Sequence, residues 1–381
     1  MYYLDHAATT PVLPEVREAM FAALEHDFGN PSSVHGFGRR ARELVEDARD
    51  RVAAAVGASP AEIVFTGGGT EADNLALKGA ASKLRGNGRH LAVSAIEHHA
   101  VLDTVEWLKR QGYETSIVEV TQDGFVTTEA LVKAVRSDTT VVSVMAVNNE
   151  IGTVQEIGSL AGAVKETNGS TLFHTDAVQA LGNIPVDVHA WGVDLAAFAA
   201  HKVGGPKGVG ALFVRSGVPV EAVIHGGGQE RGLRSGTLNV AGIVGFGIAA
   251  EIAAKEVYEK SERMEALRDR LLDGLRAIAP DVVVNGTLEM RATNNINVCI
   301  PGTEGETLLL LLDQAEIACS SGSACASGAL DPSHVLLAIG VPKELAKGSL
   351  RFSFGRDSSE DDVEAALKVL PAVVERARKV A

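Results

Sequence analysis

The sequence is short of basic charge and of long apolar runs, and each shortage excludes a class of protein. Its 35 lysine and arginine residues are outnumbered by 49 acidic ones, giving a formal net charge of −14. Proteins that bind nucleic acids or anionic membranes do so through clustered basic residues. We therefore expect neither a nucleic acid nor a membrane as a partner. The longest aliphatic run, five leucines at 308–312, is far too short to span a bilayer. The N-terminus has no basic segment followed by an apolar run, so we expect no secretory signal.

Cysteine is also scarce. Three cysteines in 381 residues do not make a disulfide framework, and they favour a reducing cytoplasm as the compartment. Cys299 lies in the alternating run "NNINVCI", which predicts a strand with an inward-facing thiol. Cys325 lies in "CSSGSACASG" (319–328), among small residues that cannot pack a core around it. On this segment alone, an idle loop thiol is the simplest interpretation.

What the sequence does contain is a regular alternation of strand and helix patterns from about residue 60. β-rich runs occur at "EIVFT", "HLAVSAI", "TSIVEV", "TTVVSVMAV", "TLFHTDA", "VDLAAFAA" and "GALFVR". Helical patterns follow most of them, including a short one at "VQALG" (178–182). This alternation predicts an α/β fold with a mainly parallel sheet and helices on its faces.

The C-terminal third has a different pattern. Residues 240–278 carry an apolar stripe at helical spacing, first apolar nearly all round and then amphipathic. This is typical of one long helix that leaves one core for another. Short strand and helix patterns follow it, which predicts a smaller α+β domain. We place the boundary near residue 256, with a large domain at 15–256 and a small one made of 1–14 and 257–381.

Polar residues follow five of the predicted strands, where ligands bind in open α/β sheets. They are Gly67–Thr70, Glu97–His99, Asn148–Glu150, Asp176 with Gln179, and His201 with Lys202. The glycine run at 67–69 precedes a predicted helix, whose free N–H groups favour a phosphate. It lacks the Lys-Ser/Thr ending of a P-loop, and a tight turn explains it nearly as well.

Lys202 and Asp176 indicate what kind of ligand this set of residues could bind. A lysine at a strand end is usually exposed, but a partly desolvated one can form a Schiff base. An aldehyde cofactor with a phosphate and a pyridine ring needs such a lysine, a carboxylate at its ring nitrogen and a phosphate cup. His98 is a candidate for a flat group over the ring, although a lone histidine is more often a packed or surface residue.

These residues lie in segments that resemble the cysteine desulfurases, pyridoxal-phosphate enzymes of the class V aminotransferase group. The segments are "YLDHAATTP" (3–11), "FGNPSSVHGFG" (28–38), "IVFTGGGTEADNLALKGAA" (63–81), "EHHAVLDT" (97–104), "VNNEIGTVQ" (147–155), "HTDAVQALG" (174–182), "HKVGGPKGVGALFVR" (201–215), "HGGGQERGLRSGT" (225–237), "SSGSACASGALDPSHVL" (320–336) and "SLRFSFGR" (349–356). They cover essentially the whole chain in order. The resemblance implies the fold-type I architecture, with a mainly parallel seven-stranded sheet in the large domain.

The resemblance implies a role for each residue around the cofactor. Lys202 is the Schiff-base lysine, Asp176 pairs with the pyridinium nitrogen and Gln179 reaches the phenolic oxygen. His98 stacks on the ring and can move protons. Asn149 lies beside the cofactor and the substrate.

The phosphate site is implied in the same way. It is formed by Gly69, Thr70 and His201, and Thr237 joins it from the partner subunit of a homodimer. The family usually has a phosphate-binding serine three residues before the Schiff-base lysine. This sequence has Ala199 there instead, which puts one phosphate contact in doubt.

The substrate residues are Arg351, which would clamp a carboxylate, and Cys325, which matches the nucleophile of the long-loop group. Its loop, at about 320–333, would swing between the cofactor and an acceptor, which explains its small residues. Cys319 occupies a position where the family does not require cysteine, and we interpret it as structural.

The implied reaction converts L-cysteine to L-alanine and leaves a persulfide on Cys325. The sulfur then passes to an acceptor protein such as an iron–sulfur scaffold. The alternatives are another class V enzyme, such as a selenocysteine lyase or an aminotransferase, and a non-catalytic metal scaffold. No Cys-x-x-Cys or clustered ligand spacing supports the scaffold, and we predict no metal site.

Overall fold

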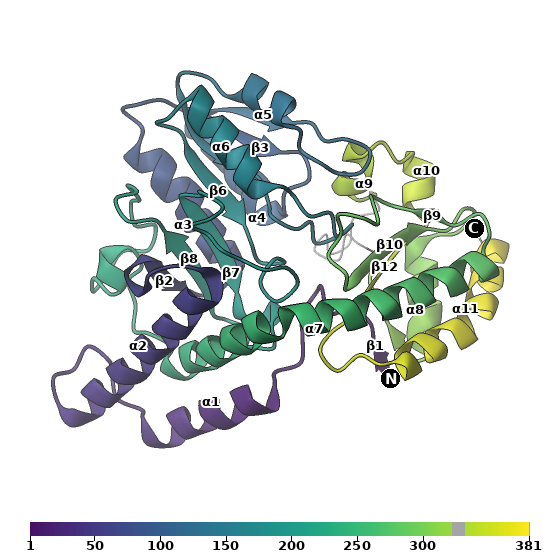
Figure 1. Ribbon diagram of the computed structural model, residues 1–381, viewed down its shortest axis with the longest axis horizontal. Coiled ribbons are helices and arrows are strands. Elements are labelled where there is room, and N and C mark those ends of the chain that lie inside the picture. Colours follow the sequence, from purple (N-terminus) through teal and green to yellow (C-terminus); the bar gives the residue numbers. More distant parts are fainter. Residues whose placement is uncertain (322–331, 381) are drawn as a thin grey trace.

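The computed structural model describes residues 1–321 and 332–380, and its largest element is a seven-stranded sheet (Figure 1). The strands run in the order β2 (Ile63–Thr66), β8 (Gly210–Val214), β7 (Leu195–Ala199), β6 (Leu172–Asp176), β5 (Thr139–Ser143), β3 (His90–Ser94) and β4 (Glu114–Val118). β8 runs antiparallel to both of its neighbours, β2 and β7, and every other pair of neighbouring strands in this sheet is parallel. The predicted α/β fold with a mainly parallel sheet is confirmed.

Helices cover both faces of the sheet, as its doubly buried strands require. On one face lie α3 (Gly69–Lys83) and α4 (His99–Arg110), which bury residues such as Leu75 and Val105 against Val141. The other face is covered by α2 (Gly36–Val56), α5 (Thr128–Ala134), α6 (Ile157–Thr167) and the first half of α7 (Val240–Ile278). Adjacent residues of one strand, Val141 and Val142, therefore belong to two different cores.

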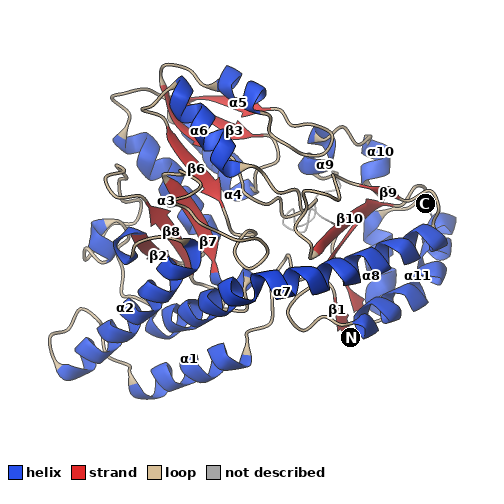
Figure 2. Ribbon diagram, viewed as in Figure 1, coloured by secondary structure: helices blue, strands red, loops and turns tan. Residues whose placement is uncertain are grey.

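A second set of elements packs around its own core at the far end of α7 (Figure 2). It comprises β1 (Tyr2–Tyr3), β9 (Val283–Val284), β10 (Asn295–Cys299), α8 (Gly305–Gln314), β11 (Ile317–Ala318), β12 (Ser349–Ser353) and α11 (Glu360–Val380). The short helices α9 (His334–Ala338) and α10 (Lys343–Ala346) pack in a separate small cluster with Ile96 and Ile151. Helix α7 gives Phe246 to the sheet core and Leu267 to this second core. The single long helix predicted at 240–278 is confirmed, whereas the domain limits 15–256 and 257–381 stay predictions.

Helix α1 (Pro14–His26) packs along α7 beneath the sheet, and β1 pairs with β11. The first residues of the chain therefore lie beside its C-terminal part (Figure 1). No helix in the described ranges has the length and apolarity needed to cross a membrane.

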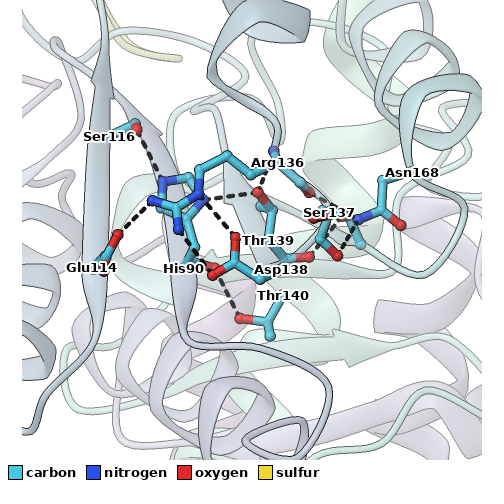
Figure 3. A network of polar contacts seen from close by, with 10 residues as sticks. His90, Glu114, Ser116, Arg136, Ser137, Asp138, Thr139, Thr140 and Asn168 are labelled. Carbon is cyan, nitrogen blue, oxygen red and sulfur yellow. Dashed lines mark hydrogen bonds and ion pairs between the residues drawn. The ribbon is translucent and has the colours of Figure 1, made fainter.

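The amino ends of β3, β4 and β5 are tied together by a polar network (Figure 3). Arg136 donates to Glu114 and Asp138, and its backbone N–H donates to Thr139. The His90 ring bridges the side chains of Thr139 and Ser116. The amino ends of these three strands are therefore held together by internal contacts.

The helix expected at 178–182 is wrong, because turns occupy this segment. The Asp176 carboxylate accepts a hydrogen bond from the Val178 N–H at 2.9 Å, which stabilises a turn directly after β6. Five residues are also too few to form a stable helix on their own.

Candidate active site

Strand pairing brings Asp176 and Lys202 to one place at the carboxyl edge of the sheet. Asp176 ends β6, and Lys202 lies in the short 3₁₀ helix Ala200–Lys202 that follows the neighbouring strand β7. Asp176 is only 4% exposed. Burial raises its pKa, while interactions with His98 and Lys202 act in the opposite direction. The predicted site residues His98 and Lys202 are therefore both within electrostatic reach of Asp176.

The N-terminal segment holds the Lys202 amine. Its Nζ donates hydrogen bonds to the carbonyl oxygens of Ala7 at 2.6 Å and Ala8 at 2.9 Å. Gln179 donates to the same Ala7 oxygen at 2.8 Å. The structure thus brings the predicted pair Lys202 and Gln179 together through a backbone group that the sequence reasoning did not assign. The motif "YLDHAATTP" was the available signal for it.

His98 caps the N-terminus of α4. Its Nδ1 accepts the backbone N–H of Ala100 at 3.0 Å. A neutral imidazole that accepts at Nδ1 carries its proton on Nε2. His98 can therefore offer an N–H donor from Nε2 near Asp176, and deliver or remove a proton at that atom.

The start of α3 forms a cradle for an anion. Gly68 has φ of +151°, a conformation that favours glycine. A Cβ on Gly69 would lie 2.6 Å from Val178 Cγ2 and 3.5 Å from the Ala199 Cβ. Gly69 therefore stands in close contact with the ends of β6 and β7, and its N-terminal N–H groups are those that bind phosphates. Thr70, the next residue, is exposed.

His201 and Thr237 are placed differently relative to this cradle. The His201 ring lies 3.1 Å from the Thr9 hydroxyl, and burial lowers its pKa to about 4. It is therefore neutral near pH 7. Thr237 is exposed, and no hydrogen bond among residues 1–321 and 332–380 joins it to Gly69, Thr70 or His201.

Arg351 and Asn149 meet at the small-domain side. Arg351 is 2% exposed; its Nη1 donates to the Asn149 carbonyl and its Nη2 to Asp5, both at 2.8 Å. Its Nε has no hydrogen-bond partner within the described part of the chain. A buried guanidinium N–H without a partner is a ready donor for a carboxylate. Sequence reasoning did not find Asp5.

The three cysteines differ in their surroundings, and therefore in how readily their thiols can react. Cys299 is fully buried in β10, as predicted. Cys319 follows β11, and burial raises the pKa of its thiol to about 12, so it supplies almost no thiolate. Cys325 lies outside the described residues, as do positions 322–331 of its predicted loop.

The residues in this site fit pyridoxal phosphate. The site offers a primary amine, a buried carboxylate next to it and a helix N-terminus where a side chain at Gly69 would clash. These are the groups that an aldehyde, a pyridine nitrogen and a phosphate require. Within 1–321 and 332–380, no three His, Cys, Asp or Glu side chains are arranged to hold a metal ion.

Comparisons with known proteins point in one direction. Residues 2–366 match the model of the family described as aminotransferase class-V. A protein named cysteine desulfurase IscS from Dictyoglomus turgidum is 48% identical over 378 residues, 99% of this chain and 95% of that protein. Cysteine desulfurase IscS 1 from Archaeoglobus fulgidus is 46% identical, with 100% and 98% coverage. The solved structure of a NifS-like protein superposes with a TM-score of 0.92 at 41% identity and covers 99% of both chains.

Proposed function

The chain belongs to the class-V aminotransferase family, and we propose that it is a cysteine desulfurase that converts L-cysteine to L-alanine. The observation that carries this proposal is the 48% identity to a named cysteine desulfurase over 99% of the chain. Enzymes of this kind depend on pyridoxal phosphate, and the donor set around Lys202 fits that cofactor. This reaction is favoured over those of a selenocysteine lyase or an aminotransferase.

The cofactor, when bound, supplies an aldehyde that bonds to amines and a protonated ring that draws electrons from the substrate. We assign Lys202 Nζ as the amine that bonds to it. The buried Asp176 would hold the proton on the ring nitrogen, and Gln179 would orient the ring oxygen. Gly69, Thr70 and His201 bind the phosphate.

Substrate binding is assigned to the small-domain side of the site. The Arg351 Nε, which has no partner among the described residues, would donate to the carboxylate of L-cysteine, and Asp5 and the Asn149 carbonyl fix the guanidinium plane. His98, with its proton on Nε2, moves a proton at the substrate side of the ring. The Lys202 amine would be a second base at that place.

The sulfur step is assigned to Cys325 by the sequence motif alone. Its thiolate forms a bond to the substrate sulfur while the carbon–sulfur bond of the substrate breaks, and the electron pair of that bond stays with the carbon that becomes alanine's methyl group. The product is a Cys325 persulfide, whose outer sulfur passes to an acceptor protein such as an iron–sulfur scaffold. A reducing cytoplasm is the compartment that this thiol chemistry favours.

A homodimer is part of the proposal. Five apolar side chains near the start of the chain are between 48% and 86% exposed: Phe21, Leu24, Phe28, Val34 and Phe37. They lie on α1, on the start of α2 and on the loop between them, and the rings of Phe28 and Phe37 are 5.1 Å apart. Such clustered exposed apolar groups mark interaction surfaces, and two-fold dimers are the commonest assembly.

The dimer predicts a defined effect of Thr237→Ala. The variant is expected to remain a dimer but to lose cofactor more readily, because its hydroxyl completes the phosphate site of the partner. Sedimentation measures the assembly, and dialysis followed by absorbance measures the retained cofactor. A fully active monomer would contradict this part of the proposal.

Ala199 predicts weaker cofactor retention than a serine would give. Ala199 lies at the end of β7, beside Gly69. A serine hydroxyl there would donate to a phosphate oxygen, and a hydrogen bond to a charged group contributes about 1.5–3 kcal/mol. Ala199→Ser is therefore expected to slow cofactor loss on dialysis by about tenfold. Equal or faster loss from the serine variant would mean that other donors already satisfy the phosphate.

The reaction itself separates the two enzyme classes. A desulfurase forms alanine from cysteine with no keto acid present, whereas an aminotransferase passes the amino group to an added keto acid. We expect alanine at an unchanged rate with and without pyruvate or 2-oxoglutarate. A rate that depends on the keto acid would favour the aminotransferase.

A further inference from the structure

Four buried polar residues lie directly behind Asp176 and have no role in the reaction assigned above. They are Asp73 on α3, Ser143 at the end of β5, His174 on β6 and Glu97 in the turn before α4, and none is more than 1% exposed. His174 and Asp176 are two residues apart on one strand, so their side chains lie on the same face of the sheet. Ser143 pairs with His174 in the neighbouring strand.

These side chains form one continuous chain of polar contacts. The Ser143 hydroxyl lies 2.9 Å from His174 Nδ1 and 3.3 Å from Glu97 Oε2. His174 Nε2 lies 3.4 Å from Asp73 Oδ1, and both atoms are buried with no hydrogen-bond partner among the described residues. The other Glu97 oxygen, Oε1, accepts from the Ser94 hydroxyl and the Met145 N–H.

Counting donors shows two arrangements in which every close contact of this chain can become a hydrogen bond. Ser143 has one hydroxyl proton and must serve both His174 and Glu97. If it donates to Glu97, His174 carries its proton on Nδ1, and Asp73 must be protonated to donate to Nε2. If it donates to His174, Nε2–H donates to Asp73, and Glu97 must be protonated to donate to Ser143. Both arrangements contain one carboxylic acid, one carboxylate and a neutral imidazole.

The surroundings favour a carboxyl group as the place for that proton. Burial lowers the pKa of His174 to about 3. Burial raises the pKa of Glu97 to about 7, and burial with repulsion from Asp176 and Glu97 raises that of Asp73 well above its usual range. The titratable group that acts on Asp73 and Glu97 from outside the cluster is Asp176, and His98 and Lys202 in turn act on Asp176.

We propose that Asp73, His174, Ser143 and Glu97 form a relay that shares one proton and keeps a single negative charge behind Asp176. In the relay the Asp73 proton moves to His174 Nε2, the Nδ1 proton moves to Ser143, and the Ser143 proton moves to Glu97. No proton is gained or lost. The four are positioning residues: the negative charge that they keep beside Asp176 would favour retention of the proton between Asp176 and the ring nitrogen. This last role rests on the proposed function, whereas the proton count does not.

The proton count is tested on the full-length protein freed of cofactor, by measuring its unfolding equilibrium between pH 5.5 and 6.5. Both carboxyls are ionised when the chain is unfolded, and the native relay keeps one proton. Stability therefore falls as pH rises, and the unfolding constant gains about tenfold per pH unit from the relay. Asp73→Asn and Glu97→Gln each remove this gain.

The double variant decides between one shared proton and two separate ones. With a shared proton, Asp73→Asn/Glu97→Gln has the same pH dependence as either single variant. With two independent acids, the pH dependence of the unfolding constant is shallower in the double variant than in either single variant, by about a further factor of ten per pH unit. That result would overturn the proposal. The matched control is Glu150→Gln, since Glu150 is a buried acid with a pKa raised to about 7 by burial and bonded to Ser333 outside the relay. When Glu150→Gln and Asp73→Asn are combined, their separate effects on the pH dependence of unfolding should add.

Two further measurements test the relay independently. Ser143→Ala separates the two ends, so each acid holds its own proton and the pH dependence of the unfolding constant becomes steeper by about tenfold per pH unit. An unchanged slope would contradict the relay.

In the holoenzyme, the pH midpoint of the cofactor's visible absorbance should stay the same in both single variants, which keep one charge. The midpoint should fall in the double variant, in which the cluster carries no negative charge. An unmoved midpoint there would overturn the link to Asp176, even if the alanine assay succeeds.

Discussion

Lys202→Ala is expected to abolish alanine production while leaving the fold intact. The amine bonds covalently to the cofactor in the proposed reaction, and losing covalent catalysis costs orders of magnitude in rate. The structure gives a reason for the fold to survive. Lys202 is only partly buried, and the hydrogen bonds from its Nζ go to the Ala7 and Ala8 carbonyls. Alanine production at saturating cysteine, with circular dichroism and thermal unfolding, provides the measurement.

The matched control for this variant is Lys207→Ala. Lys207 lies five residues further on, in the same connection after β7, and is exposed. It should keep its activity and bind cofactor normally. If Lys202→Ala retained even about a tenth of the alanine production, the assignment of the covalent lysine would be wrong.

Cys325→Ser is expected to stop persulfide formation while still allowing cysteine to bind at the cofactor. Serine oxygen cannot take up sulfur as a thiolate does, and Cys325 has no assigned part in holding the cofactor. Mass spectrometry of the protein after one turnover with cysteine gives the measurement. The wild type should gain one sulfur on the peptide that contains Cys325, and the variant should gain none.

The other two cysteines are its controls. Cys319→Ser should keep desulfurase activity, because the thiol with a pKa raised to about 12 is not a nucleophile near neutral pH. Cys299→Ser should also stay active, although it buries a hydroxyl beside the Asn285 amide, which now lies 3.1 Å from the Cys299 sulfur. Extra sulfur on Cys319 instead of Cys325 would overturn the assignment.

The sheet could be predicted from the sequence because each of its strands is a short β-rich run separated from the next by a helix-length segment. The ends of β6 and β7 were visible for the same reason: Asp176 and Lys202 interrupt apolar runs. The pattern could not separate a short helix from a hydrogen-bonded turn at 178–182, because the Asp176 side chain decides that segment.

The residues that the sequence did not assign depend on contacts between distant elements. Asp73 lies within the ordinary helical pattern of "TEADNLALK", and nothing in that pattern places it 3.4 Å from a histidine on β6. Asp5 is 346 positions away from the arginine that it holds. Such pairs follow from the way α3 and the N-terminal segment pack on the sheet and on β12, which local periodicity does not encode.

The most direct test of the desulfurase assignment is to incubate the purified holoenzyme with L-cysteine and a reductant and to quantify alanine and sulfide together. The account predicts that both products form in equal amounts, that both are lost in Lys202→Ala, and that no keto acid is needed. Sulfide without alanine, or alanine that appears only when a keto acid is supplied, would contradict it.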